Sequence, residues 1–425
     1  MFRPSLLCLP VEVIDQVLLY TKDGPFHTQK DQKTLHAMCL TSKYLYASAK
    51  PQLYHEINTG AADLLLLARS LVAKPNLALL IRELNIRSPS QYDLEEAHTL
   101  LRTSDLVPAH WTRTLRPGDR PATTLLLLEA LLLQAQHLET LSFCSSQDLV
   151  HVRLFEGRKS RPMPSLPVLK DLEIYVPSAG GRRDGLLTQV KTILPRQEKL
   201  YIELPSRLHF KRAHLDLTLL EDLDISCDYM TRIDVVEIVQ ACPKLKSFGY
   251  HGGNLRDLVF AGLEPVAVKE LFDALRPRER RLKKAAVHYF YDEWAEDELR
   301  PKDMLPDLHN FVKLADLDVD FESLLDISRS ADSEMEEEPW EETDFLRKLP
   351  RSIRQMRIFK ADSRLEKEIK DIAQYQPQHL PYLKTLILEY YEELIAHERF
   401  TEDVDDNLAE VKEALNKAGI KLLMD

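Results

Sequence analysis

Glycine is scarce in this sequence, at 12 of 425 residues, against a usual share of roughly 7%. Nucleotide-binding enzymes use glycine in loops where the backbone approaches phosphate closely. The motifs GxxxxGK(S/T), GxGxxG, GxSxG and HExxH are also missing, and with them the usual signatures of phosphate-binding loops, serine hydrolases and zinc proteases. The sequence therefore predicts a protein that is not an enzyme and that uses no cofactor and no metal.

Cysteine is rare and unpaired in pattern. The five cysteines are odd in number, widely spaced and without a CxxC pair, which is typical of reduced thiols inside the cell. Cys227 and Cys242 stand in apolar contexts, so we expect them to be core thiols and not nucleophiles. The apolar runs near the N-terminus and at residues 125–133 are too short for a signal peptide or a membrane span. We expect a soluble protein of the cytoplasm or nucleus, with no membrane partner.

Positive charge is in deficit, because the formal net charge is −12. Binding to nucleic acid needs clustered positive charge, so no nucleic-acid partner is expected. Residues 332–344 hold eight acidic residues and no basic one. We interpret the segment 330–344 as a disordered, self-repelling insertion. The alternative is a partner-binding or autoinhibitory segment.

One basic cluster stands out against this background. It consists of Arg276, Arg278, Arg280, Arg281, Lys283 and Lys284. The simpler interpretation is a solvated helix end, where cations complement the helix dipole. The functional one is a docking patch for an acidic or phosphorylated substrate segment, with Arg278, Arg280, Arg281, Lys283 and Lys284 as its candidate residues.

The first sixty residues predict three short helices. Pro10 suits a first helical turn, and the residues that follow it recur at helical spacing: Val13, Ile14, Val17 and Leu18. A polar loop at 21–33 contains Gly24-Pro25. A second helix is expected around residues 35–40 and a third over residues 42–49.

The third helix is expected to stop before Pro51, with Leu53, Tyr54 and Ile57 continuing as an apolar clamp. Three such helices make a thin core, and the stripe with Leu9 and Ile14 should remain exposed. A domain of this kind packs on its neighbour or binds a partner. Alternatively, it caps the array that follows.

The order of these residues resembles the F-box of fungal-type F-box proteins. The matching strings are Leu9-Pro10-x-Glu12-Val13-Ile14, then Leu40-Thr41-Ser42-Lys43, then Pro51-x-Leu53-Tyr54. The loop at 21–33 is longer than usual, and Tyr44-Leu45 departs from the family pattern. The resemblance implies docking on the Skp-type adaptor of a cullin–RING ubiquitin ligase. The implied adaptor-binding residues are Leu9, Pro10, Val13, Ile14, Val17, Leu18, Leu40, Leu45, Pro51, Leu53 and Tyr54.

From residue 80 onward a six-residue phrase recurs: an apolar residue, two mostly polar, one apolar, one polar, one apolar. Its copies begin at Ile81, Leu138, Leu169, Leu200, Leu220, Leu245, Leu282, Leu314, Ile353 and Leu383. At 44% apolar residues the phrase alone is expected by chance. Its context is informative, because Pro167, Pro243 and Pro381 each lie two residues before a copy, and helix-like stretches separate the copies at 186–194, 233–241, 266–275 and 365–373.

A strand, a loop and a helix in each unit of roughly 20–30 residues is typical of leucine-rich repeats. An ordinary α/β domain is the alternative. A final helix carrying Val404, Leu408, Val411 and Leu415 ends before Gly419, and residues 420–423 suit a last strand. This closing element would cover the open edge of the array.

The sequence thus predicts an α/β chain: a three-helix F-box at residues 1–58, then an irregular leucine-rich-repeat solenoid at 59–425 with the acidic insertion 330–344. The expected function is substrate recognition in an SCF (Skp–cullin–F-box) ubiquitin ligase. The expected partners are a Skp-type adaptor, the cullin scaffold and an unknown protein substrate. The alternative is a repeat scaffold with no ligase role.

Overall fold

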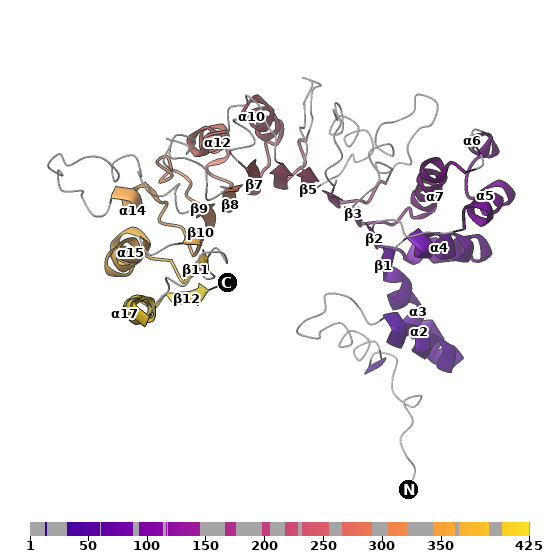
Figure 1. Cartoon of the computed structure of the whole chain (residues 1–425), viewed down its shortest axis with the longest axis horizontal. Helices are drawn as coiled ribbons and strands as arrows, with labels where there is room; N and C mark the ends of the chain where they lie inside the picture. The colour runs from indigo at the N-terminus through magenta and orange to yellow at the C-terminus, as the bar shows by residue number, and fades with distance from the viewer. Residues whose placement is uncertain are drawn as a thin grey trace, which may run out of the picture. The chain divides into compact units, whose positions relative to one another are not determined.

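The structure is a computed structural model of the chain (Figure 1). It describes residues 13–14, 32–59, 61–87, 93–113, 116, 118–144, 166–175, 198–204, 217–227, 232–254, 266–290, 305–320, 344–361, 365–390 and 402–424. The chain divides into two compact units. Unit 1 comprises Met1–Ala179 with Gln189–Gln197, and unit 2 comprises Gly180–Thr188 with Glu198–Asp425. The predicted boundary at residue 58 is not where these units divide.

Unit 1 opens with a small helical module, made of α2 (Gln32–Thr41), α3 (Lys43–His55) and the helical residues Val13 and Ile14. Ser42 begins α3 as its N-cap, and its Oγ accepts a hydrogen bond of 3.1 Å from the Leu45 N–H. This bond satisfies one of the free N–H groups of the first turn. The core of the module is formed by Ile14, Leu35, Leu45 and Ala49.

The prediction that the third helix ends before Pro51 is wrong, because α3 continues through Pro51 to His55. A proline inside a helix removes one backbone hydrogen bond. Leu53, two residues after Pro51, packs against the core of the module. The burial of this side chain offsets the lost hydrogen bond. Ile57, predicted to belong to the clamp, lies instead in the first strand, β1 (Glu56–Thr59).

The remaining strands of unit 1 are β2 (Glu83–Arg87), β3 (Thr140–Cys144) and β4 (Asp171–Tyr175). They pair in parallel in sequence order, β1 with β2, β2 with β3 and β3 with β4. The described helices between them are α4 (Ala61–Ala73), η2 (Pro75–Leu80), α5 (Leu94–Thr103), α6 (Ala109–Thr112) and α7 (Arg120–Gln134). The leucine-rich run at 125–133 is the middle of α7, which packs against α4 and α5 and is buried on several sides.

Unit 2 repeats this arrangement. Its strands are β5 (Lys199–Leu204), β6 (Asp222–Cys227), β7 (Ser247–Asn254), β8 (Lys284–Phe290), β9 (Asp316–Asp320), β10 (Gln355–Ala361), β11 (Thr385–Tyr390) and β12 (Lys421–Met424). Each pairs in parallel with the next strand in sequence. Its described helices are α10 (Arg232–Ala241), α12 (Val268–Leu275), η3 (Arg276–Arg278), α14 (Asp344–Lys348), α15 (Leu365–His379) and α17 (Glu402–Lys417).

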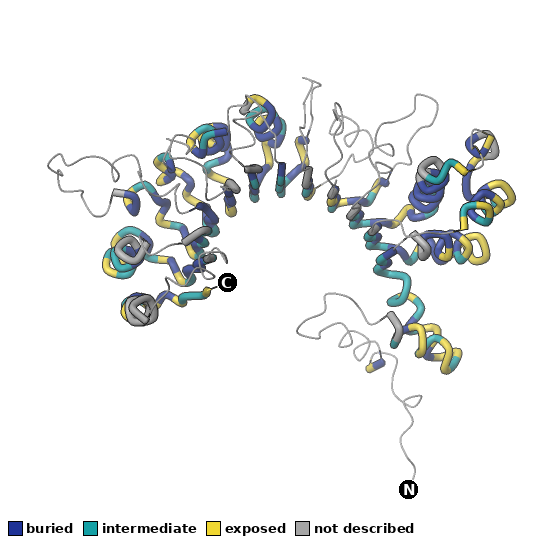
Figure 2. Tube along the Cα trace, viewed as in Figure 1, coloured by how far each residue is buried: buried dark blue, intermediate teal, exposed yellow. Residues whose placement is uncertain are grey.

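Helices α10, α12, α15 and α17 lie on the same side of the unit 2 strands (Figure 1). Buried residues lie where these helices meet the strands (Figure 2). The predicted helices at 233–241 and 266–275 are confirmed. The helix predicted at 365–373 continues to His379, and the one at 186–194 falls outside the described residues.

Each in-register copy of the phrase begins with a turn and continues as a strand. In all of these copies but one, the N–H of the first phrase residue donates to the carbonyl three residues earlier, for example Leu169 to Leu166 (3.2 Å), Leu245 to Cys242 (3.4 Å) and Leu383 to Leu380 (3.0 Å). In the remaining copy, Leu282 donates to Arg278, four residues earlier (2.9 Å). The recurring prolines occupy the second position of these turns, where a fixed φ and a missing N–H are favourable. The proline signal in the sequence therefore has a structural cause.

Neighbouring copies are also linked through the second phrase position. The Glu221 carbonyl accepts from Lys246 (2.7 Å) and Ser247 (3.0 Å). The Lys246 carbonyl in turn accepts from Lys283 (2.6 Å) and Lys284 (3.2 Å). Each copy thus fixes the start of the next strand before the regular ladder begins.

The copy assigned to Leu200 is out of register. Leu200 pairs with Leu223 of β6, and Leu223 is the fourth residue of its own phrase. The true first position of this copy is therefore residue 197, which is a polar glutamine. The sequence pattern misplaced the copy because its first apolar residue is absent.

The predicted closing element is confirmed where the structure describes it. Val411 and Leu415 of α17 are buried, and Gly419 takes a left-handed conformation, with φ of +75°, that favours glycine after a helix. β12 then pairs with β11. None of the helices in the described part of the chain has the length and apolar character needed to cross a bilayer.

Candidate functional site

In five neighbouring strands of unit 2, β6 to β10, equivalent positions of the phrase lie side by side and form rows across the sheet. In β6 every second residue is buried, and successive side chains of a strand point to opposite faces. Phrase positions four and six face the helices, so positions three, five and seven face the other way. We call the side formed by positions three, five and seven of β6–β10 the open face.

Position five of these strands forms one row across the sheet. The pairing register places Asp224, Gly249, Ala286, Asp318 and Arg357 side by side in that order. Position seven forms the adjacent row, with Ser226 next to His251, His251 next to His288, and Asp320 next to Phe359. The two rows bring together a set that we call the acid–histidine cluster: Asp224, His251, His288, Asp318 and Asp320.

The rings of the position-seven row are in contact. The His251 and His288 rings stack with centroids 4.9 Å apart. His288 lies against Phe359 with a centroid distance of 3.7 Å. Nε2 of His251 is 3.2 Å from Oδ1 of Asp224, and Nδ1 of His288 is 3.9 Å from Oδ1 of Asp320. A continuous strip of rings therefore lies beside the carboxylates.

Burial changes the protonation behaviour of the cluster. Desolvation, with a smaller contribution from His251, lowers the pKa of His288 to about 3. Desolvation raises the pKa of the Asp318 carboxyl, although Lys284 opposes this change. Nζ of Lys284 is 3.8 Å from Oδ2 of Asp318. His288 is thus neutral near pH 7, and the surroundings of Asp318 disfavour the charged form of its carboxyl group.

Three buried polar atoms of the cluster make no hydrogen bond. They are Nδ1 of His288, Oδ1 of Asp318 and Oδ1 of Asp224. Of these residues, His288 and Asp318 are at least nine-tenths buried, with exposed fractions of 6% and 7%. Buried polar atoms without a partner are uncommon and costly. Atoms of this kind on a binding surface have capacity for a ligand.

Gly249 is required by the geometry of the position-five row. A Cβ at this residue would lie 2.7 Å from both Cγ and Oδ1 of Asp224, closer than non-bonded atoms approach. The Asp224 carboxylate therefore leans over the glycine, towards His251. A side chain at position 249 would move it.

The structure divides the predicted adaptor-binding residues into three groups. Leu9, Pro10, Val17 and Leu18 fall outside the described residues. Ile14 and Leu45 are buried in the core of the helical module. The prediction that Ile14 is left exposed is therefore wrong: its side chain shares the core of the module with Leu35 of α2 and with residues of α3.

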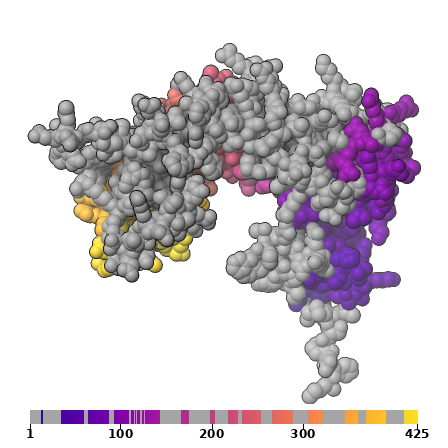
Figure 3. All heavy atoms as spheres, in the orientation of Figure 1, coloured from indigo at the N-terminus to yellow at the C-terminus, as the bar shows by residue number. Residues whose placement is uncertain are grey.

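Other predicted residues of the module remain accessible. Leu40 is 75% exposed and Val13 is 41% exposed. Pro51 is exposed, and Leu53 and Tyr54 are half-buried. Tyr44 and Tyr46, which were not among the predicted contacts, are 39% and 37% exposed. Figure 3 shows atoms of α2 and α3, in indigo, at the molecular surface.

The predicted basic patch does not form a single surface, and including Arg278 in it was wrong. Arg278 is 6% exposed. Its guanidinium donates to the carbonyls of Gln240 (2.9 Å) and Cys242 (3.3 Å), because the end of α10 leaves these oxygens free. Arg280, Arg281 and Lys283 are exposed, whereas Lys284 belongs to the open face beside Asp318.

Cys227 and Cys242 are buried free thiols, as predicted. Burial raises the pKa of the Cys242 thiol to about 12, so it carries almost no thiolate near neutral pH. The acidic run 332–344 lies outside the described residues apart from Asp344, which begins α14.

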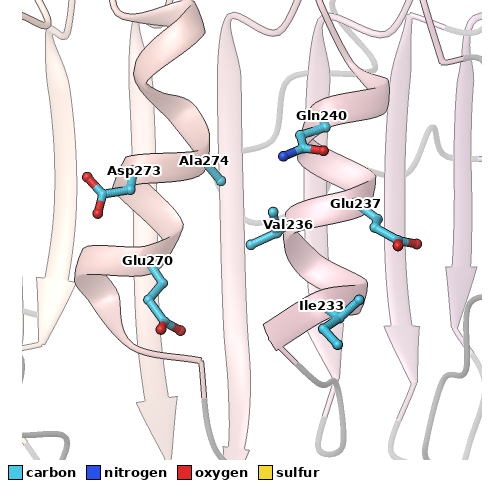
Figure 4. A pocket seen from close by; sticks show the side chains of 7 residues that line it. All are labelled: Ile233, Val236, Glu237, Gln240, Glu270, Asp273 and Ala274. Carbon is cyan, nitrogen blue, oxygen red and sulfur yellow. The ribbon is translucent and has the colours of Figure 1, made fainter.

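A groove lies between α10 and α12 (Figure 4). This groove of about 460 Å³ is lined by Ile233, Val236, Glu237, Gln240, Glu270, Asp273 and Ala274. Two of its acids have partners within the same helical segment: Glu270 accepts from the Ala267 N–H at 3.4 Å, and Asp273 accepts from Nε of Arg276 at 2.8 Å. Local contacts account for these two side chains.

The open face was missed from the sequence, although a signal existed. Once the copies of the phrase are aligned, their fifth and seventh residues can be read as rows, and His251 and His288 fall in the same column. Within the described ranges, no group of three histidine, cysteine or acidic side chains is arranged to hold a metal ion. No model of a known protein family matches the chain, and no curated protein is similar to it.

Proposed function

We propose that the chain is the substrate-recognition subunit of an SCF-type ubiquitin ligase. The helical module would bind a Skp-type adaptor, and the strand array, read as an irregular leucine-rich-repeat solenoid, would bind the target. Such a protein works in the cytoplasm or nucleus and carries out no chemistry itself. By holding a target lysine near a charged conjugating enzyme, it raises the effective concentration of the reacting groups.

The observation that carries this proposal is the exposure of large apolar side chains on the module. Leu40 is 75% exposed on α2, only a few residues from the packed core around Leu35. Burying a leucine against a partner contributes about 1.5–3 kcal/mol. Val13, Tyr44 and Tyr46 add apolar and aromatic area of the kind enriched at protein interfaces. The resemblance of this stretch to the F-box names the partner.

The repeat assignment is supported by local geometry. Consecutive strands within each unit pair in parallel with their sequence neighbours. The same turn precedes strand after strand. First phrase positions lie 23 residues apart from residue 197 to Leu220 and 25 apart from Leu220 to Leu245, which matches the size of a repeat.

A variant of Leu40 tests adaptor binding directly. Leu40→Asp places a charge where an interface would bury it unpaired, so binding of a purified Skp-type adaptor should fall at least tenfold. His36→Asp is the matched control, because it adds the same charge at an exposed position one turn earlier on α2. Binding is measured by calorimetry with the full chain, and folding by thermal melting. Undiminished adaptor binding by Leu40→Asp contradicts the proposal.

The second candidate is a repeat scaffold with no ligase role, in which the module only caps the array. It is favoured by the direct passage of α3 into β1 at His55–Glu56 and by contacts between α3 and η2. A cap has no need of an adaptor. A folded wild-type chain that binds no Skp-type adaptor establishes this second function.

A further inference from the structure

The open face carries an excess of negative charge. Its acidic residues come from two strands, Asp222 and Asp224 on β6 and Asp316, Asp318 and Asp320 on β9. Against these five stand Lys284 on β8 and Arg357 on β10. Nη1 of Arg357 lies 3.8 Å from Oε2 of Glu389 on the next strand, which takes up part of its charge. A partner that complements this surface is positively charged.

Asp318 offers a specific acceptor within this field. Its Oδ2 is near Lys284, at 3.8 Å, but its Oδ1 is buried without a hydrogen bond. Leaving a buried carboxylate oxygen unsatisfied destabilises the protein, and an N–H from a bound cation would remove that cost. This oxygen is a second indication of a ligand, independent of the charge count.

The row between the two position-five carboxylates is occupied by small residues. Asp224 and Asp318 are separated by Gly249 and Ala286, neither of which has atoms beyond Cβ. Adjacent strands lie about 4.8 Å apart, so three intervals place the two strands about 14 Å apart. A side chain laid along this row could reach a carboxylate at either end.

The ring strip suits the rest of such a side chain. His251, His288 and Phe359 border the row. Aliphatic stems of lysine and arginine pack on apolar surface, and a guanidinium stacks on flat rings. Because burial keeps the pKa of His288 near 3, its ring is neutral and does not repel a cation near pH 7.

We propose that the acid–histidine cluster binds a basic segment of a protein partner, with an arginine or lysine side chain lying between Asp224 and Asp318. If the proposed function holds, the partner is the protein that the ligase ubiquitinates. Only this identification of the partner rests on the proposed function. The binding itself needs nothing from the helical module. This surface repels an acidic or phosphorylated segment, which is the kind of ligand that the basic cluster at residues 276–284 suggests.

The first experiment selects peptide ligands from a library of random sequences, so that no ligand chemistry is assumed. The full chain is immobilised and panned with a phage-displayed library of random twelve-residue peptides. Arginine and lysine should be enriched among the selected peptides relative to the starting library. The enrichment should disappear when the double variant Asp224→Asn/Asp318→Asn is the bait. Selection of acidic peptides, or the same basic enrichment with the double variant, overturns the proposal.

Matched variants then separate a specific site from general charge attraction. The best selected peptide is labelled, and its affinity is measured by fluorescence anisotropy. Asp224→Asn and Asp318→Asn should each weaken binding about tenfold, the loss expected for one charge-assisted hydrogen bond. Asp222→Asn and Asp316→Asn remove the same charge from the same strands, at position three, and should change affinity less than about threefold. Equal losses in all four variants overturn the site.

Two controls keep the outcomes distinct. Asp318 is buried, so thermal melting is compared for every variant, and the half-exposed Asp224 carries the test if Asp318→Asn alters folding. Adaptor binding is measured on the same preparations. A wild-type chain that binds the adaptor but no basic peptide overturns this inference alone, whereas a wild-type chain that binds the peptide but no adaptor overturns only the proposed ligase role.

Discussion

Strands β2–β4 of unit 1 and β6–β9 of unit 2 are built from the same phrase but present different chemistry. At position four the two sets are interchangeable: Leu84, Leu141 and Leu172 in one and Leu223, Phe248, Ala285 and Leu317 in the other, all buried. At position five they diverge. Unit 1 has Asn85, Ser142 and Glu173, and unit 2 has Asp224, Gly249, Ala286 and Asp318.

This difference separates two roles within one six-residue pattern. The inward positions must be apolar because they fill the space between strands and helices. The open positions are under no such demand, so polar and charged side chains can occupy them. Unit 1 uses them for mostly neutral groups, while unit 2 gathers carboxylates and imidazoles there.

Removing an inward side chain should have the largest effect, and a similar one in both units. Leu141→Ala should destabilise unit 1 by about 2–5 kcal/mol, and Phe248→Ala should destabilise unit 2 by about 3–5 kcal/mol, because each leaves a cavity. Ser142→Ala and Ser247→Ala, one residue away on the open side, should cost less than about 0.5 kcal/mol. Urea unfolding measures all four. Comparable losses for inward and open positions would contradict the two-role division.

Arg278 is a buried charged residue that donates hydrogen bonds to backbone carbonyls within the fold, unlike the charged residues of the open face. Replacing it with methionine keeps the stem but leaves the Gln240 and Cys242 carbonyls without their donor. The free energy of unfolding should fall by about 1–3 kcal/mol. Arg280→Met is the exposed control and should change stability by less than about 0.5 kcal/mol. An unchanged free energy of unfolding in Arg278→Met would show that the hydrogen bonds of Arg278 contribute nothing to stability, as expected of a surface residue.

The buried histidine should make unit 2 sensitive to acid. The pKa of His288 is lowered to about 3 by burial, so below pH 6.5 the unfolded chain takes up a proton that the folded chain does not. The free energy of unfolding should therefore fall, by up to about 2 kcal/mol between pH 7 and pH 5. The raised pKa of Asp318 acts in the opposite direction, because the folded state then binds its proton first as pH falls.

His288→Gln should remove this contribution and flatten the pH dependence of unfolding over the same range. Urea titrations at pH 7, 6 and 5 measure the slope. Ser226→Ala, in the same row but not titratable, serves as the control and should retain the wild-type slope. An unchanged slope in His288→Gln would show that His288 is accessible to protons in the folded protein.

Gly249→Ala should have the smallest effect on stability and a clear one on binding. The added Cβ must displace the Asp224 carboxylate, a flexible group, so stability should change by no more than about 1 kcal/mol. Affinity for the basic peptide should fall to the level of Asp224→Asn. In an Asp224→Ser background the same glycine substitution should have almost no further effect on affinity. If Gly249→Ala lowers affinity as much in the Asp224→Ser background as in the wild type, the glycine does not act through the position of the Asp224 carboxylate.

Much of the fold could be predicted from the sequence. The phrase located nine of the twelve strands that the described residues form, in the correct register, because inward burial imposes apolar residues at fixed spacing. It failed at β5, where the first position is polar, and at β1, where the polar Thr59 stands at position six. Pro51 was taken as a helix end because local rules describe the isolated helix and not the core contact of Leu53.

The candidate site was harder to predict, for a physical reason. His251, His288 and Asp318 lie far apart in sequence and become neighbours only through strand register. Burial of individual side chains was equally inaccessible: Ile14 and Arg278 look like surface residues by type or context, but the packing of their neighbours encloses them. Charge clusters in a linear sequence say little about which charges share a face.

The shared carbonyl at the second phrase position has a consequence for how such a chain can change over time. First phrase positions lie 25 residues apart from Leu220 to Leu245 and 39 apart from Leu314 to Ile353, yet both strand pairs keep an unbroken register. The start of each strand is set by the preceding copy and not by the length of the connection. Segments can therefore be gained or lost between copies while Asp224, His288 and Asp318 keep their neighbours, so the connections are free to diversify around a conserved arrangement of rows.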